Sequence, residues 1–168
     1  MRRQKQEIKE FEKMLQVLEK GQVCRIAFFD REYPYIVPLN YGVRTEDGQV
    51  YLYFHGAHVG KKRDLMKENN KVGFETDVEY GLVVDEEAGR GGMNYESIIG
   101  QGVLEEVTDQ GERLRALDCI AAHYPLPENF KFCEAAKKAA KVLRLTVTKM
   151  TGKSRLTVRY SDQGWVYE

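Results

Sequence analysis

The chain has 168 residues, enough for one domain with a substantial core, and its 26 basic residues balance its 26 acidic residues. A net charge of zero provides no general attraction for nucleic acid or an anionic membrane surface, so any anion site has to be local. No apolar run approaches the roughly 18 residues of a membrane span, and three widely spaced cysteines fit reduced thiols. We therefore expect a cytoplasmic protein with a single domain over residues 1–168.

The first part of the chain changes from a helical to a strand pattern. Apolar residues at helical spacing predict a helix over Glu7–Lys20, which Gly21 ends. β-branched and aromatic residues then predict strands over Val23–Phe29, Tyr35–Val43 and Val50–Phe54. A short helix over Val59–Glu68 follows.

The second part returns to strands and closes with helices and a final strand. The predicted strands are Lys71–Thr76, Gly81–Asp85, Tyr95–Ile99, Gly102–Val107 and Val142–Lys149. Three glycines predict a mobile loop over Glu86–Met93. Helices are expected from the Thr108-Asp109 cap to His123 and over Phe132–Lys141. Many short strands with few helices favour a mainly β fold, a small closed or partly closed barrel with covering helices.

A candidate anion site lies where the strand ending at Phe54 meets a basic helix. The segment reads His55, Gly56, Ala57, His58, Val59, Gly60, Lys61, Lys62 and Arg63. Small residues let a ligand approach the backbone, free N–H groups at a helix start favour negative charge, and lysines add cations. The segment therefore predicts a cradle for a phosphorylated ligand, although a plain turn before a solvated basic helix would show the same residues. It is not a Walker loop, because the glycine spacing and the Lys-Ser/Thr pair are missing.

Two other polar features are open to more than one interpretation. His55 and His58 stand three apart with Cys24 upstream, but only His123 remains as a further histidine and no Cys-x-x-Cys pair occurs, so we expect no metal. Arg25 lies in an otherwise apolar strand, where it either faces solvent or has an anionic partner.

Four segments, in this order and spacing, resemble a known family. They are Cys24–Asp30, Tyr33–Gly42, Phe54–Lys62 and Tyr95–Gly102. The chain resembles the FMN-binding split-barrel proteins of the pyridoxamine 5'-phosphate oxidase-like superfamily, and looks most like their nitroimidazole-resistance branch. The resemblance runs from about Glu7 to Ser154 and implies an FMN-binding split β-barrel, while the tail over residues 156–168 is outside it.

The resemblance also implies a set of site residues. It places Lys61 at the phosphate-binding lysine, with Lys62 as the alternative, and it makes the flavin phosphate a reasonable partner for Arg25. A histidine of the same loop is implied near the substrate, either His55, which we favour, or His58. The cofactor-binding residues that it implies are Arg25, Val37, Pro38, Leu39, Asn40, His55, Gly56, Ala57, Gly60, Lys61, Lys62 and Ser97.

The strand that carries Asn40 is implied to run along the flavin ring, with Ser97 on a strand beside it. Gly60 stands where the oxidase has an arginine before its lysine, and the oxidase's C-terminal substrate signature is not recognisable, which argues against pyridoxamine 5'-phosphate as the substrate.

The function implied by the resemblance is that of an FMN-dependent oxidoreductase, a homodimer with the flavin at the subunit interface. A small electron acceptor, such as a nitroaromatic compound, is the expected substrate. No Gly-x-Gly-x-x-Gly fingerprint is present, so a nicotinamide donor would have to bind directly over the flavin. The alternatives are a flavin- or haem-binding module without turnover and a pure interaction domain. The glycines, histidines and lysines of residues 55–62 argue against the latter.

Overall fold

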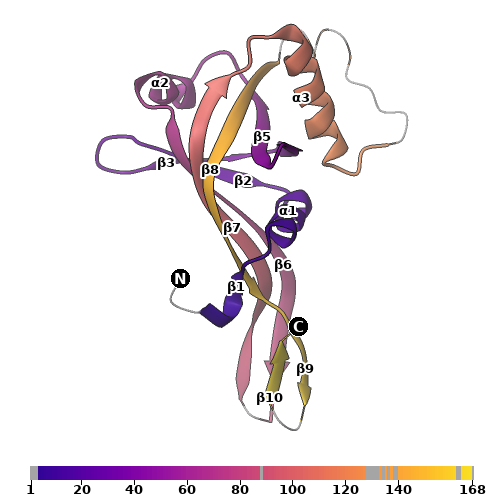
Figure 1. Ribbon diagram of the computed structural model, residues 1–168. Coiled ribbons are helices and arrows are strands. Elements are labelled where there is room, and N and C mark those ends of the chain that lie inside the picture. The colour runs from indigo at the N-terminus through magenta and orange to yellow at the C-terminus, as the bar shows by residue number, and fades with distance from the viewer. Residues whose placement is uncertain are drawn as a thin grey trace.

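An antiparallel sheet of eight strands carries the fold in the computed structural model, which describes residues 4–87, 89–127, 133, 135, 137, 140–161 and 164–167 (Figure 1). The strand order is β3-β2-β6-β7-β8-β5-β4, and β1 pairs with β8. The strands of this sheet are β1 (Glu7–Ile8), β2 (Cys24–Phe28), β3 (Tyr35–Leu39), β4 (Tyr41–Glu46), β5 (Gln49–Gly56), β6 (Lys71–Asp85), β7 (Arg90–Glu106) and β8 (Lys141–Arg155). A separate hairpin joins β9 (Thr157–Ser161) to β10 (Gly164–Tyr167).

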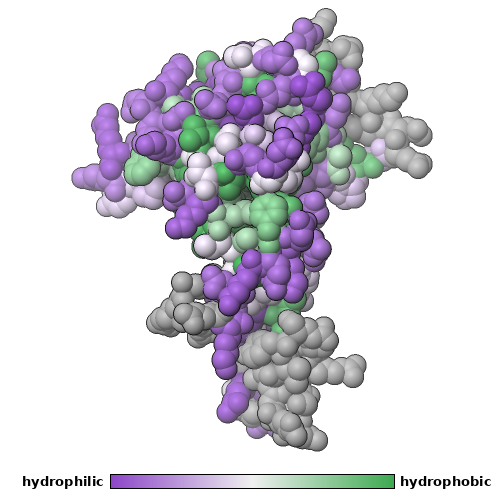
Figure 2. All heavy atoms as spheres, in the orientation of Figure 1, coloured by the Kyte–Doolittle hydropathy of each residue, from purple (hydrophilic) through white to green (hydrophobic). Residues whose placement is uncertain are grey.

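The helices cover parts of this sheet. They are η1 (Gln4–Gln6), α1 (Phe11–Lys20), α2 (Lys61–Glu68) and α3 (Gln110–Ala122). Figure 2 shows hydrophilic side chains over α2 and α3 and hydrophobic side chains gathered below them, at the middle of the molecule. In the described part of the chain, no helix combines the length and the apolar character that crossing a membrane requires.

Strand alternation divides the apolar residues between two cores. In β2, Cys24, Ile26 and Phe28 are buried while Arg25 is exposed, because successive side chains point to opposite faces. The inward residues of the other strands complete the main core, together with Leu18 of α1. A second core forms where α3 packs on Tyr53 of β5. The predicted mainly β fold, a split β-barrel with covering helices, is therefore confirmed.

The prediction of a loop over Glu86–Met93 is wrong from Arg90 onward. β6 and β7 form one long hairpin, in which Gly91 and Gly92 pair with residues of β6. The part of the hairpin farthest from α2 reaches well beyond the barrel (Figure 1). At position 92, the Arg155 guanidinium occupies the space where a Cβ would stand. Both glycines therefore lie within a paired strand and not in a turn.

Several other boundaries differ from the predictions. Helix α1 begins only at Phe11, because residues before it form η1 and β1. The predicted strand over Tyr35–Val43 is interrupted at Asn40, which separates β3 from β4. The strand predicted over Val142–Lys149 is longer in the structure, where β8 runs from Lys141 to Arg155. The helix predicted over Phe132–Lys141 falls mostly outside the described residues, and Lys141 itself begins β8.

A buried tyrosine holds the start of β4 against α1 and β6. The hydroxyl of Tyr41 donates to the carbonyl oxygen of Leu18 at 2.5 Å and lies 3.2 Å from Oγ1 of Thr76. Thr76 in turn donates to the carbonyl oxygen of Val23 at 3.0 Å. Burial raises the pKa of Tyr41, so its hydroxyl stays a donor. The centre of its ring lies 4.5 Å from the centre of the His123 ring. This contact holds the end of α3 against the start of β4.

Tyr41→Phe should lower the free energy of unfolding by about 1–2 kcal/mol, because it leaves a buried carbonyl without its donor. Urea denaturation measures the difference. Tyr33→Phe is the matched control, because Tyr33 is 77% exposed and should lose little. Equal losses in the two variants would contradict the role of the buried hydroxyl.

Candidate functional site

The N-terminus of α2 is open to an anion. Its N-cap residue, Gly60, has φ +123°, a conformation that favours glycine, and a Cβ there would meet nothing within 4 Å. No side chain caps α2, whereas Asp109 caps α3 by accepting from the Glu112 amide at 2.7 Å. The first amides of α2 therefore remain available to a negatively charged ligand.

Lys62 brings an unneutralised cation to this end of the helix. Its Nζ lies over Gly56, where an added Cβ would be only 2.5 Å away. Burial lowers the pKa of Lys62, and the neighbouring charge of Arg63 lowers it further. Among the residues that the structure describes, Lys62 makes no ion pair. A partly buried ammonium group without a counter-ion fits an anionic ligand such as a phosphate.

Lys61 is engaged differently from Lys62, although the two are adjacent. It forms an ion pair with Asp30 and lies 4.8 Å from the centre of the Tyr35 ring. The carboxylate of Asp30 already neutralises Lys61, so its charge is less available to a ligand. These contacts also place the start of β3 beside the N-terminus of α2.

Arg63 has a structural environment that the sequence did not indicate. It is only 7% exposed, and its Nη2 donates to Oε2 of Glu106 at 2.6 Å. Lys141 Nζ lies 2.7 Å from the other oxygen of Glu106. Hydrogen bonding from Lys141 lowers the pKa of Glu106, with a further contribution from Arg63. The basic triplet is thus divided among three environments, and Arg63 anchors α2 to the end of β7.

Strand β3 leads away from α2 along an edge of the sheet. It pairs only with β2 among the described strands, so its other edge leaves main-chain groups available. Pro38 and Asn40 are exposed, whereas Val37 and Leu39 pack against the main core. Of the predicted contacts on this strand, Val37 and Leu39 can therefore offer a ligand their main chain only.

Arg25 lies beside this strand on the outer face of the sheet, and Ser97 lies on the same face two strands beyond Arg25. Arg25 pairs with Pro38 in register and has two carboxylate partners on β6: its Nη1 donates to Asp77 Oδ1 at 2.6 Å and to Glu75 Oε2 at 3.0 Å. These hydrogen bonds, the one to Asp77 first, raise the pKa of Arg25. Ser97 of β7 is the cross-strand partner of Asp77.

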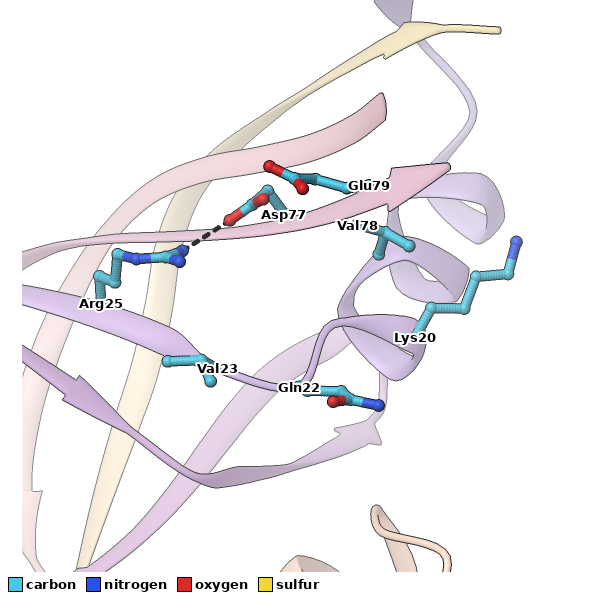
Figure 3. A pocket seen from close by; sticks show the side chains of 7 residues that line it. All are labelled: Lys20, Gln22, Val23, Arg25, Asp77, Val78 and Glu79. Atoms are coloured by element: carbon cyan, nitrogen blue, oxygen red, sulfur yellow. Dashed lines mark hydrogen bonds and ion pairs between the residues drawn. The ribbon is translucent and has the colours of Figure 1, made fainter. Parts of the chain in front are cut away.

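A cavity of about 360 Å³ opens next to Arg25 (Figure 3). Its lining residues are Lys20, Gln22, Val23, Arg25, Asp77, Val78 and Glu79. Asn40 donates its side-chain amide to the carbonyl oxygen of Gln22 at 3.5 Å, so the cavity begins where β3 ends. The sequence analysis missed this cavity, since its walls come from segments more than 50 residues apart.

The histidines are distributed over two regions. His55 is exposed at the end of β5, and His58 is exposed in the segment before α2, so the structure keeps both beside the cradle. His123 lies at the end of α3, where its Nε2 is 2.6 Å from the carbonyl oxygen of Gly21. In the described part of the chain, no three histidine, cysteine or acidic side chains group as metal ligands.

Glu106→Gln should lower the free energy of unfolding at neutral pH by about 1–3 kcal/mol. The loss is smaller than for a fully buried pair because the Glu106 side chain is 27% exposed. Since the folded pKa of Glu106 is lowered, the wild-type protein keeps this contribution above the ordinary glutamate pKa and loses it as the pH falls through the folded value.

Urea denaturation from neutral to acidic pH measures this effect, and the difference between the two proteins should narrow in acid. Glu105→Gln is the matched control, because Glu105 is 50% exposed and lies 3.4 Å from Arg144. A pH-independent difference would argue against a charge effect at Glu106.

Comparison with known proteins places this geometry in a family context. The family model for pyridoxamine 5'-phosphate oxidase matches residues 10–154. No curated protein matches the chain significantly.

Among solved structures, a candidate 5-nitroimidazole antibiotic resistance protein from Bacteroides thetaiotaomicron shares 29% identity, with a TM-score of 0.73 over 88% of this chain and 85% of that one. An FAD-binding protein from Mesorhizobium loti shares 22% identity, with a TM-score of 0.62 over 88% of this chain and 96% of that one. An FAD- and haem-binding protein from Mycobacterium smegmatis shares 18% identity, with a TM-score of 0.73 over 96% of this chain and 83% of that one.

Proposed function

Because the chain belongs to the pyridoxamine 5'-phosphate oxidase family, we propose that it is an FMN-binding oxidoreductase that reduces a small electron acceptor, such as a nitroaromatic compound. The observation that carries the cofactor proposal is the ammonium group of Lys62 at the uncapped start of α2, partly buried and without a counter-ion among the described residues. The similarity to flavin-binding structures and to a candidate nitroimidazole resistance protein supports the same proposal.

The residues at α2 fit the phosphate of FMN. Lys62 supplies a positive charge, the first amides of α2 supply donors, and the glycines at positions 56 and 60 leave room for a close approach. Lys61, which the sequence favoured for this role, is the weaker candidate because Asp30 already neutralises it. We therefore assign the main phosphate contact to Lys62.

The edge of β3 fits the other end of the cofactor. Its exposed main-chain groups and the amide of Asn40 can orient a flat, polar ring. When bound, FMN supplies hydride or electron transfer, and the protein's contribution is to bind it, orient it and control access to it. His55 and His58, both beside the cradle, are the candidates for holding or donating a proton on the substrate side.

We also propose a homodimer that covers the outer face of the sheet. Ile36 of β3 is 57% exposed and Ile99 of β7 is 60% exposed, and the same strands carry the predicted flavin contacts. On the long hairpin, Leu82 is 66% exposed and Val84 is 56% exposed. Exposed apolar residues of this size on one sheet favour association. Sedimentation at twice the chain mass of 19.4 kDa would support the dimer, and sedimentation as a monomer would contradict it.

The function is tested by the absorption spectrum and by redox cycling. The purified protein should retain a flavin with a band at about 450 nm, and chromatography of the extracted cofactor should identify FMN. Under anaerobic conditions, NADH or dithionite should bleach this band, and a nitroimidazole should restore it.

The same experiment distinguishes a second function, a flavin- or haem-binding module, which the similarity to the FAD- and haem-binding protein favours. Such a module would be reduced chemically but would not be reoxidised by the acceptor, and a haem would show a Soret band. A protein that retains no flavin would overturn the proposed oxidoreductase.

Lys62→Met should weaken FMN binding more than tenfold, which corresponds to about 1.4 kcal/mol, because it removes the cation of α2 that no described carboxylate neutralises. Lys61→Met is the matched control and should change the dissociation constant by less than about threefold. Quenching of flavin fluorescence during titration measures both. If Lys61→Met weakened FMN binding more than Lys62→Met, the phosphate contact would belong to Lys61.

A further inference from the structure

We propose that the cavity beside Arg25 binds an organic cation, a protonated amine or an amidinium on a small apolar body, and that it is the substrate side of the site. The cavity lies between the end of α1, the start of β2 and the middle of β6 (Figure 3). Its volume of about 360 Å³ is in the range of small-molecule pockets.

One carboxylate of the cavity lining has no cation partner among the described residues, whereas both lining cations are paired. Arg25 donates to both Asp77 and Glu75, so these carboxylates already neutralise its charge. Lys20 lies 3.9 Å from Glu96. Glu79 lines the cavity and makes no ion pair among the described residues. The lining has two cations, Lys20 and Arg25, and two carboxylates, Asp77 and Glu79. Glu75 and Glu96 lie outside the lining and engage its cations, so among the described residues Glu79 is the lining charge without an ion pair.

Glu75, which lies beside the cavity lining, feels the negative charge of Asp77. Burial raises the pKa of Glu75 and repulsion from Asp77 adds to the rise, although the hydrogen bond from Arg25 opposes both. Figure 3 shows the carboxylates of Asp77 and Glu79 on the same side of β6. A cation placed here would relieve repulsion, whereas an anion would add to it.

The uncharged part of the lining indicates the rest of the ligand. Val23 provides apolar contact surface, and Gln22 provides an amide. Val78, between Asp77 and Glu79 on β6, packs against the main core. A compact organic cation, whose charged group lies against Glu79 and whose body contacts Val23, matches both kinds of lining.

The position of the cavity connects it to the proposed cofactor. Strand β3 begins beside Lys61, which lies over Tyr35, and ends at Leu39, about 13 Å away at 3.3 Å per residue. Asn40 then contacts Gln22 at the cavity. The inference that the bound cation is a substrate rests on the proposed function, which assigns β3 to the flavin ring; the cation site itself depends only on the lining.

Calorimetry with two probes of similar shape and opposite charge tests the site on the full-length protein without flavin. Benzamidinium should bind at least tenfold more tightly than benzoate. Glu79→Gln should weaken benzamidinium binding at least fivefold, whereas Glu12→Gln, which removes the same charge from an exposed position on α1, should change it less than twofold. Equal binding of the two probes, or no effect of Glu79→Gln, would overturn the cation site.

A second measurement tests the relation to the cofactor. In the FMN-loaded protein, saturating benzamidinium should shift the flavin absorption bands, and Glu79→Gln should raise the concentration required. Calorimetric binding without any spectral shift would overturn the substrate-side assignment. If the protein retained no FMN, the proposed function would fail, and calorimetry on the flavin-free protein would still decide the cation site.

Discussion

The hydroxyl of Tyr41 is the constraint on which the rest of the candidate site depends. It is buried against the carbonyl oxygen of Leu18 and the hydroxyl of Thr76, and a buried polar group of this kind is costly unless it is bonded. Tyr41 directly follows Asn40, at the break between β3 and β4. Fixing the tyrosine therefore fixes the end of β3 and the amide that contacts Gln22 at the cavity.

Charge pairing at α2 decides which cation is available. Asp30 pairs with Lys61 and Glu106 pairs with Arg63, whereas Lys62, between them, has no counter-ion in the part of the chain that the structure describes. Each pairing also has a structural consequence. The first places the helix beside the start of β3, and the second, largely buried, attaches it to the end of β7. The same ion pairs that orient the helix are the basis for our proposal that Lys62 contacts the phosphate.

The outer face of the sheet connects the two ends of the site. Strand β3 runs from the α2 end to the cavity, while Arg25, Asp77 and Ser97 lie on successive neighbouring strands. A cofactor held at α2 and extended along this edge would meet an acidic cavity at its far end. Exposed isoleucines lie on the same face, which the proposed homodimer would cover.

The sequence by itself determined the strand and helix types, the position of the cradle and the mainly β barrel. Alternation in Cys24–Phe28 and the cap at Asp109 are local signals, and local geometry followed them. The glycines at positions 91 and 92 were misread because glycines in turns and in strands have the same local pattern. Only the tertiary structure paired Lys61 with Asp30, buried Arg63 and gave Arg25 its partners on β6. Those outcomes depend on carboxylates about 30 to 50 residues away in the chain, which only the folded sheet brings into contact.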